Sequence, residues 1–322
     1  MKKTSFVLLV IILLFAFSAC HKTSPAGDLR PIDEVDNWAY QLQNADPQQI
    51  ANSGFQLIVM DYSRDGTEDE KYSPADLQLL KDNGVIPICY ISIGEVEDYR
   101  YYWQSDWTNN PPQWLGTENP EWKGNYAVRY WYPQWKQIIF DYLDKIIDQG
   151  FMGIYLDKVD EFEYWADSTE NYDGDIYPED STARWMIEFI REIADYVRAK
   201  NPDFYIIPQN GERILEYDND GTILSLISAW GVEDMFYNET QPWTGDDWNY
   251  ILSDRIPNLK KVLDAGHPVF SVDYVDSGPY LGENKQRILD YYDKCKQYGY
   301  IPYAAISDRA LDKLNIINGL QP

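Results

Sequence analysis

A single structural unit recurs along this chain: a helix that stops at a glycine, followed almost at once by a short apolar strand. The pattern occurs five times, at glycines 54, 84, 150, 266 and 299, and glycine suits the left-handed residue that follows a helix end. The clearest copy starts at Gly150, continues through the apolar run 151–156 and ends on Asp157. Such a run is typical of a strand that is covered on both faces.

Eight such strands alternate with helical segments. We expect strands at 38–43, 55–60, 85–93, 151–156, 204–208, 229–233, 268–272 and 300–306, and helices at 46–53, 73–81, 133–149, 181–200, 248–265 and 283–297. This α/β order favours a single (β/α)8 TIM barrel over residues 34–322, with aromatic-rich insertions after strand three (99–132) and strand four (164–180). A doubly wound open sheet is the alternative, but its glycine-rich phosphate turn is missing.

The first twenty residues resemble a bacterial lipoprotein signal. Lys2 and Lys3 precede an apolar stretch that is too short to span a bilayer comfortably. We therefore predict a signal peptide at 1–19, lipidation of Cys20, a tether at 20–33, and a secreted protein whose only membrane contact is its lipid anchor, with ordinary secretion as the alternative. Cys89 and Cys295 alone remain beyond it, so no disulfide framework is expected.

Acidic or amide residues follow seven of the predicted strands. In the barrel fold, catalytic groups lie at the C-terminal ends of strands. The seven are Asp61, Glu95, Asp157, Asn210, Glu233, Asp273 and Asp308. An acidic ring of this kind can bind a metal ion, perform paired-carboxylate hydrolysis or hold a cationic ligand.

The histidine count and the net charge bear on which of these three uses is possible. The chain has only two histidines, His21 and His267, whereas barrel metallohydrolases rely on imidazole ligands. We assign no metal and no cofactor, although an all-oxygen magnesium or calcium site stays open. Serine or cysteine nucleophiles would lack a histidine base. The net charge of −26 repels phosphate backbones, so no nucleic-acid partner is expected.

Paired carboxylates need no histidine, because one carboxyl can donate a proton to the leaving oxygen while the other stays ionised. Asp157 and Glu233 both follow unbroken apolar strands, two strands apart, and could face each other across the barrel mouth. A salt bridge at the barrel rim is the structural alternative for each. Glu212 competes with Glu233 for the acid role, because it closely follows strand five.

Several motifs resemble glycoside hydrolase family 114 and its bacterial relatives. They are the strand-one segment 38–42, the strand-three segment 90–100 from Tyr90, the strand-four segment 153–160, residues 209–211, and the strand-six segment 231–237. The resemblance covers about residues 38–312. It implies a (β/α)8 barrel that cleaves α-1,4-linked galactosamine polysaccharides endo-wise, with Asp157 as nucleophile and Glu233 as acid/base.

The leading hypothesis is therefore a secreted, lipid-anchored, retaining endo-glycosidase whose partner is an amino-sugar polysaccharide. We expect substrate contacts from Asp61, Glu95, Asn210, Asp273, Asp308 and Tyr90. A non-catalytic carbohydrate-binding barrel on the cell surface is the alternative, in which aromatic residues of the first insertion form stacking surfaces: Tyr99, Tyr101, Tyr102, Trp103, Trp107 and Trp114. The structural alternative for these residues is a lid that folds over its own core. A metal-dependent polysaccharide deacetylase is a third option.

Overall fold

The computed structural model describes residues 30–169 and 171–322. The predicted signal peptide, Cys20 and most of the tether lie outside these ranges, so lipidation and secretion stay predictions. Within the described ranges, no helix combines the length and the apolar character that crossing a membrane requires.

All eight predicted strands are present, and they are parallel to their neighbours. One ladder joins five strands in the order β1-β2-β3-β7-β8, and another joins three in the order β9-β12-β13. Their bounds are β1 (Trp38–Tyr40), β2 (Leu57–Met60), β3 (Ile86–Ser92), β7 (Gly153–Asp157), β8 (Tyr205–Pro208), β9 (Trp230–Glu233), β12 (Val269–Asp276) and β13 (Ile301–Ile306).

The two ladders meet along both seams. A parallel bridge pairs Gln209 with Gly231, which brings β8 beside β9. At the other seam, the indole of Trp38 in β1 donates a hydrogen bond to the carbonyl of Ile301 in β13, at 2.9 Å. The strands thus follow one another around the fold in chain order, as a (β/α)8 barrel requires.

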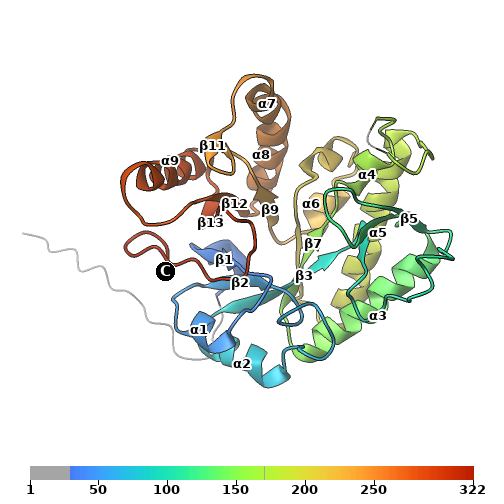
Figure 1. The fold of residues 1–322 in the computed structure, drawn as a ribbon, viewed down its shortest axis with the longest axis horizontal. Coiled ribbons are helices and arrows are strands. Elements are labelled where there is room, and N and C mark those ends of the chain that lie inside the picture. Colours follow the sequence, from blue (N-terminus) through green and yellow to red (C-terminus); the bar gives the residue numbers. More distant parts are fainter. Residues whose placement is uncertain (1–29, 170) are drawn as a thin grey trace, which may run out of the picture.

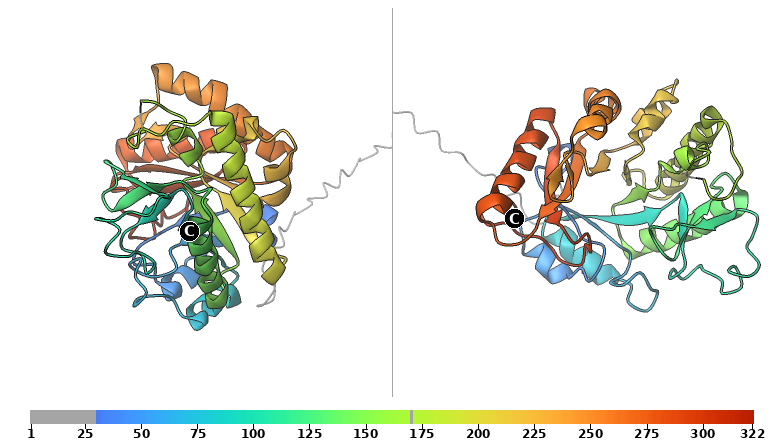
Figure 2. Two further views of the ribbon diagram at one scale, coloured as in Figure 1. Left: turned by 90° about the vertical axis from the view of Figure 1, so that its right-hand side faces the viewer. Right: turned by 45° about the horizontal axis from the view of Figure 1, so that its top comes forward.

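Helices surround the strands, as Figures 1 and 2 show from three directions. The helices are α1 (Pro47–Ala51), α2 (Pro74–Asp82), α3 (Pro133–Gln149), α4 (Glu161–Tyr164), α5 (Glu179–Lys200), α6 (Thr222–Leu226), α7 (Gly245–Tyr250), α8 (Ile256–Asp264) and α9 (Gly282–Tyr298). Short 3-10 helices lie at Ile32–Glu34 and Glu212–Glu216, and a π-helical turn at Ile251–Arg255 joins α7 to α8. Capping residues determine where two of these helices begin: Asp46 caps α1 and Ser73 caps α2, and a proline follows each of them.

The five glycines predicted to end helices all have positive φ, between 77° and 97°. Gly150 shows why. It caps α3 at φ 96° and turns the chain directly toward β7, which carries Asp157. A side chain in that conformation would be strained. The helix-to-strand transitions were therefore readable from the sequence.

Aromatic rings fill the interior of the barrel. Trp38 packs against Phe270 and Tyr303, with ring centroids 5.3 and 5.9 Å apart, and Tyr155 lies 5.5 Å from Tyr40. Space for Tyr155 comes from Gly231, because a Cβ there would lie 1.8 Å from the Tyr155 hydroxyl oxygen. A glycine at this point of β9 allows the ring of β7 to cross the interior.

The insertion after β3 folds as a three-stranded antiparallel sheet, β4 (Glu95–Glu97), β6 (Asn125–Val128) and β5 (Leu115–Glu118). Its tryptophans mostly pack inward. Trp107 and Trp114 are buried, and their ring centroids lie 4.9 Å apart. Trp114 in turn lies 5.4 Å from Trp135 of α3. The expectation that these two residues form an exposed stacking surface is wrong, because the insertion uses them as its own core.

We expect Gly231→Ala to destabilise the protein by about 3 kcal/mol, because the added methyl group overlaps the buried Tyr155 ring. Urea unfolding measures this change. Gly174→Ala is the control: nothing lies within 4 Å of the added Cβ, so its cost is about 1 kcal/mol from the positive φ of 79° alone, a strain that Gly231 in its strand does not have. Equal losses in the two variants would contradict the packing argument.

Candidate functional site

A cavity of about 560 Å³ opens where the strands end, and every strand of the barrel contributes to its lining. The contributors, in strand order from β1 to β13, are Tyr40, Asp61, Tyr90, Asp157, Gln209, Glu233, Tyr274 and Arg309. Such convergence at the C-terminal end of a barrel marks the usual position of an active site in this fold. The sequence anticipated this location.

Asp157 and Glu233 face this cavity because of strand periodicity. Side chains two residues apart point to the same face of a strand. Asp157 follows the inward-pointing Tyr155 by two residues, and Glu233 follows Gly231 by two. The contact between Tyr155 and Gly231 therefore places both carboxylates one layer higher in the barrel, at its mouth. The two predicted catalytic residues line the same cavity.

Asp157 has a polar neighbour on the adjacent strand. The Tyr90 hydroxyl donates a hydrogen bond of 2.5 Å to Asp157 Oδ2. Burial and, second, the negative charge of Glu233 raise the pKa of Asp157 to about 7. The Tyr90 hydrogen bond and the positive charge of Lys158 act in the opposite direction. Near neutral pH, this carboxyl can therefore gain or lose a proton.

Glu233 is held by several donors. Tyr274 donates to Oε1, whereas the side-chain amides of Gln209 and Asn210 donate to Oε2, the latter at 3.3 Å. The Asn210 oxygen also accepts the backbone N–H of Glu233, at 3.0 Å. Burial raises the pKa of Glu233, and the charge of Asp234 adds to this, while the hydrogen bond from Tyr274 lowers it. The carboxyl is thus fixed in orientation, and its pKa lies above its ordinary value.

Arg309 supports this arrangement from the side. Its guanidinium binds both oxygens of Asp234, at 3.0 and 2.7 Å. It also lies over the Tyr274 ring, 3.9 Å from the centroid. The arginine therefore fixes the tyrosine that donates to Glu233, and it neutralises the neighbouring Asp234. Sequence reasoning missed Arg309 because it follows β13 by three residues and carries no motif.

Glu212, the predicted competitor for the acid role, does not line the cavity. It is buried and paired with Arg255. Arg255 in turn donates to the carbonyl oxygen of Glu233 at 3.0 Å and to the side-chain oxygen of Asn210 at 3.3 Å. This geometry gives Glu212 a supporting position behind the site and leaves Glu233 as the carboxylate that faces Asp157.

The predicted substrate contacts divide into two groups. Tyr90, Asn210, Glu95 and Asp61 line the cavity. Asp61 is nevertheless only 5% exposed and ion-paired with Arg100, at 2.7 Å, so its charge is largely committed within the protein.

Asp273 and Asp308 do not line the cavity. Strand β12 runs four residues farther than predicted, to Asp276, so Asp273 lies inside the strand rather than at its end. It is fully buried and accepts hydrogen bonds from the backbone N–H groups of residues 235, 236 and 237. Asp308 caps its own turn by accepting from the N–H of Ala310. For these two residues the expectation of substrate contact does not agree with the structure.

Two exposed aromatic residues line the cavity: Tyr99, which is one of the predicted stacking residues, and Trp122, which sequence reasoning did not single out. Trp122 is 57% exposed and Tyr99 is 46% exposed. Both belong to the insertion after β3, whose other large rings pack inward. Aromatic faces of this kind stack on the apolar faces of sugar rings. Sequence reasoning also missed Tyr274, because it predicted that this strand ends at residue 272, whereas β12 continues to Asp276.

Metal ligands are not apparent around the cavity. Among the residues that the structure describes, no group of three or more His, Cys, Asp or Glu side chains is arranged to hold a metal ion. The chemistry available to the residues present is proton transfer and nucleophilic attack by two carboxyl groups.

We expect Tyr90→Phe to raise the pKa of Asp157 above about 7, because the substitution removes a hydrogen bond that stabilises the ionised carboxylate. Carboxyl-carbon NMR of protein labelled at aspartate measures this titration, with Asp157→Asn to assign the signal. Tyr280→Phe, at a tyrosine that does not line the cavity, is the control and should leave the titration unchanged. An unchanged or lower pKa in Tyr90→Phe would refute the stated role of the hydroxyl.

We expect Glu212→Gln to destabilise the protein by about 3 kcal/mol, because it leaves the Arg255 charge without its carboxylate partner. Glu233→Gln should cost far less, since burial already disfavours the charge on Glu233. Urea unfolding of both variants at pH 7 makes the comparison. If the order of stabilities were reversed, Glu212 would not have the supporting role described above.

Comparisons with known proteins agree with this geometry. The chain is 58% identical to a protein of Methanocaldococcus jannaschii over 279 residues, covering 86% of this chain and 78% of the relative. It is 49% identical to a Thermotoga maritima protein, covering 98% and 93%.

Solved structures share the fold. The glycoside hydrolase domain of PelA from Pseudomonas aeruginosa superposes with a TM-score of 0.64 at 17% identity, covering 87% of this chain and 97% of that one. Aspergillus fumigatus Ega3, solved in complex with galactosamine, gives a TM-score of 0.64 at 16% identity, covering 91% and 99%.

The family comparison covers almost the full length of the sequence. The model of glycoside-hydrolase family GH114 matches residues 19–320. That span includes Asp157, Glu233 and the strands that position them. The chain therefore belongs to glycoside hydrolase family GH114 and is an O-glycosyl hydrolase.

Proposed function

We propose that this protein is a retaining, endo-acting hydrolase of α-1,4-linked galactosamine polysaccharides, with Asp157 as nucleophile and Glu233 as acid/base. The observation that carries the proposal is that these two carboxyl groups line one cavity at the strand ends, each oriented by donors from neighbouring strands. Paired carboxyl groups in one cleft are the machinery of most glycosidases.

The proposed reaction has two steps. Glu233 donates its proton to the glycosidic oxygen while Asp157 attacks the anomeric carbon, so that the leaving chain departs and a glycosyl ester forms on Asp157. Glu233, now ionised, then takes a proton from water, and the water oxygen displaces Asp157 from the anomeric carbon. Burial supports the first step, because it raises the pKa of Glu233 and so favours the protonated acid.

A cationic sugar would assist the nucleophile. Asp157 has a pKa of about 7 because of burial and the charge of Glu233, so it is only partly ionised at neutral pH. An ammonium group that enters the cavity lowers this pKa by favouring the carboxylate. The net charge of −26 also attracts a polycation. The galactosamine bound in the structure of Ega3 is a sugar of this kind and supports the choice of substrate.

We expect Asp157→Asn and Glu233→Gln each to lower the release of oligosaccharides from deacetylated galactosamine polymer by about a thousandfold or more. Mass analysis of the products, with acetylated polymer in parallel, measures activity and substrate preference. Circular dichroism checks that both variants are folded. Near-wild-type turnover in either variant would end the assignment.

Azide distinguishes the two roles within the same experiment. With an aryl galactosaminide, whose leaving group needs no acid, Glu233→Gln should form a glycosyl azide of retained configuration, because azide replaces water at the ester on Asp157. Azide in the Asp157→Asn variant should instead give the inverted product. The opposite pattern would exchange the roles of the two residues.

A further inference from the structure

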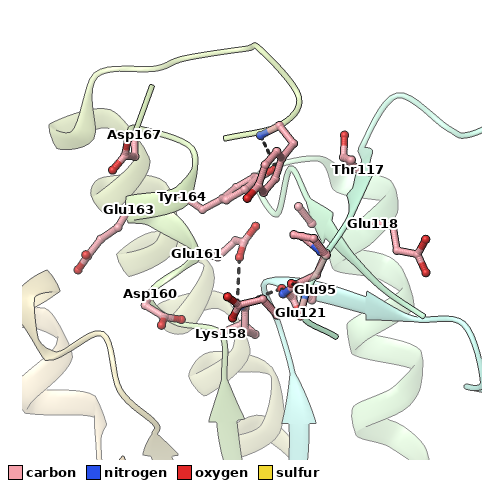
Figure 3. Close-up of a pocket in the computed structure, with 14 residues that line it drawn as sticks. Glu95, Thr117, Glu118, Glu121, Lys158, Asp160, Glu161, Glu163, Tyr164 and Asp167 are labelled. Atoms are coloured by element: carbon pink, nitrogen blue, oxygen red, sulfur yellow. Dashed lines mark hydrogen bonds and ion pairs between the residues drawn. The ribbon is translucent and has the colours of Figure 1, made fainter. Parts of the chain in front are cut away.

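A second pocket, of about 420 Å³, adjoins the catalytic cavity. Glu95, Lys158 and Asp160 line both spaces, so the two lie side by side. The walls of the second pocket come from the two insertions of the barrel: strand β5 and the loop after it on one side, and α4 with Asp167 on the other (Figure 3). We call this space the insertion pocket.

The insertion pocket is strongly acidic. Its carboxylate-bearing residues are Glu95, Glu118, Glu121, Asp160, Glu161, Glu163 and Asp167. Lys158 is the cation among its lining residues, and its ammonium group is already engaged, 3.0 Å from Glu95 and 3.8 Å from Glu161. Asp160 precedes α4 but makes no capping hydrogen bond. From outside the lining, Arg213 lies 3.6 Å from Glu163. Asn119 and Asn125 donate hydrogen bonds to Glu95. The lining itself nevertheless carries more acidic side chains than cationic ones.

Glu161 is the feature that points to a ligand. It is only 2% exposed, and its Oε1 atom is buried without a hydrogen-bond partner. A buried, unsatisfied carboxylate oxygen costs free energy that a protein normally avoids. Burial also raises the pKa of Glu161 far above its usual range, although Lys158 opposes this. Figure 3 shows Glu161 at the centre of the pocket, between Tyr164 and Lys158.

The backbone is adapted to hold this group in place. Gly94 packs directly against the turn before α4, because a Cβ there would lie 2.3 Å from the carbonyl oxygen of Lys158 and 2.5 Å from the Cβ of Glu161. Lys158 itself has a positive φ of 62°, which is unusual for a residue other than glycine. The chain thus turns sharply after Asp157 and directs Glu161 into the adjoining pocket.

We propose that the insertion pocket is a distal subsite that binds the ammonium group of an amino-sugar unit beyond the bond that is cleaved. This inference rests on the proposed function. The ammonium group would donate to Glu161 Oε1 and to Asp160, and the sugar ring would lie beside Tyr164 and Tyr172, which also line the pocket. The polymer would then run from the insertion pocket past Asp160 into the catalytic cavity.

An ammonium ion fits better than a divalent metal. Lys158 already places one ammonium group against Glu95 and Glu161, which shows that these carboxylates accept such a donor. The same lysine repels a doubly charged ion more strongly than a singly charged one. In the described part of the chain, moreover, no cluster of His, Cys, Asp or Glu is arranged as a metal site.

The test compares Glu161→Gln with wild type on galactosamine oligomers of increasing length and on an aryl galactosaminide. Glutamine keeps the shape of the side chain but cannot ionise, so the carboxylate charge that a bound ammonium group would favour is lost. We expect KM for the long oligomers to rise about tenfold relative to KM for the aryl glycoside, because one charge-assisted hydrogen bond is lost. Glu283→Gln, on the surface of α9, removes the same charge away from both pockets and is the control.

Binding to the Asp157→Asn variant separates this proposal from the proposed function. Calorimetry with galactosamine oligomers should show about tenfold weaker binding when Glu161→Gln is added. If the oligomers bind in this Glu161-dependent way but wild type never cleaves them, the subsite stands and the proposed hydrolysis fails. If wild type cleaves them with a KM and product lengths that Glu161→Gln leaves unchanged, the subsite is refuted. Glu161-dependent binding of calcium or magnesium, without an effect on the oligomers, would also overturn it.

Discussion

The close approach of Tyr155 to Gly231 is the contact on which the geometry of the site depends. Tyr155 crosses the barrel interior from β7, and β9 admits its ring because residue 231 has no side chain. The tyrosine hydroxyl has no hydrogen-bond partner, so the fit is steric rather than polar. Since side chains alternate along a strand, this contact also determines which residues of β7 and β9 point inward. Asp157 and Glu233 are the next inward positions on those strands.

Around this pair, the protein keeps two carboxyl groups in a setting that disfavours their charges. Burial raises the pKa of both, and their mutual repulsion adds to the effect on Asp157. Hydrogen bonds from Tyr90 and Tyr274 limit the shift and hold the carboxylates in place. Behind them, Arg309 and Arg255 support the orienting side chains. Such an arrangement costs stability but leaves Asp157 with a pKa of about 7, so that this carboxyl can exchange a proton near neutral pH.

The insertions extend this site sideways. Trp107 and Trp114 of the first insertion pack against each other and are buried, whereas Trp122 and Tyr99 of the same insertion are exposed at the cavity. The second insertion brings Glu161 next to Lys158, in a pocket that adjoins the cavity. In the function that we propose, these acidic groups suit a polymer that carries one positive charge per sugar. Under that proposal, the barrel provides the reacting groups and the insertions provide surface for the rest of the polymer.

Much of this was local enough to read from the sequence. Helix-ending glycines marked five of the strands, apolar runs marked all eight, and the residues that follow the runs located Asp157 and Glu233, because each of these signals depends on neighbouring residues. Tertiary structure decided what each acidic residue faces. Asp273 belongs to a longer strand and holds a loop, Asp61 pairs with an arginine 39 positions later, and Glu212 pairs with Arg255. Those partners are distant in the chain, so the direction and burial of each carboxylate depend on packing that no local pattern encodes.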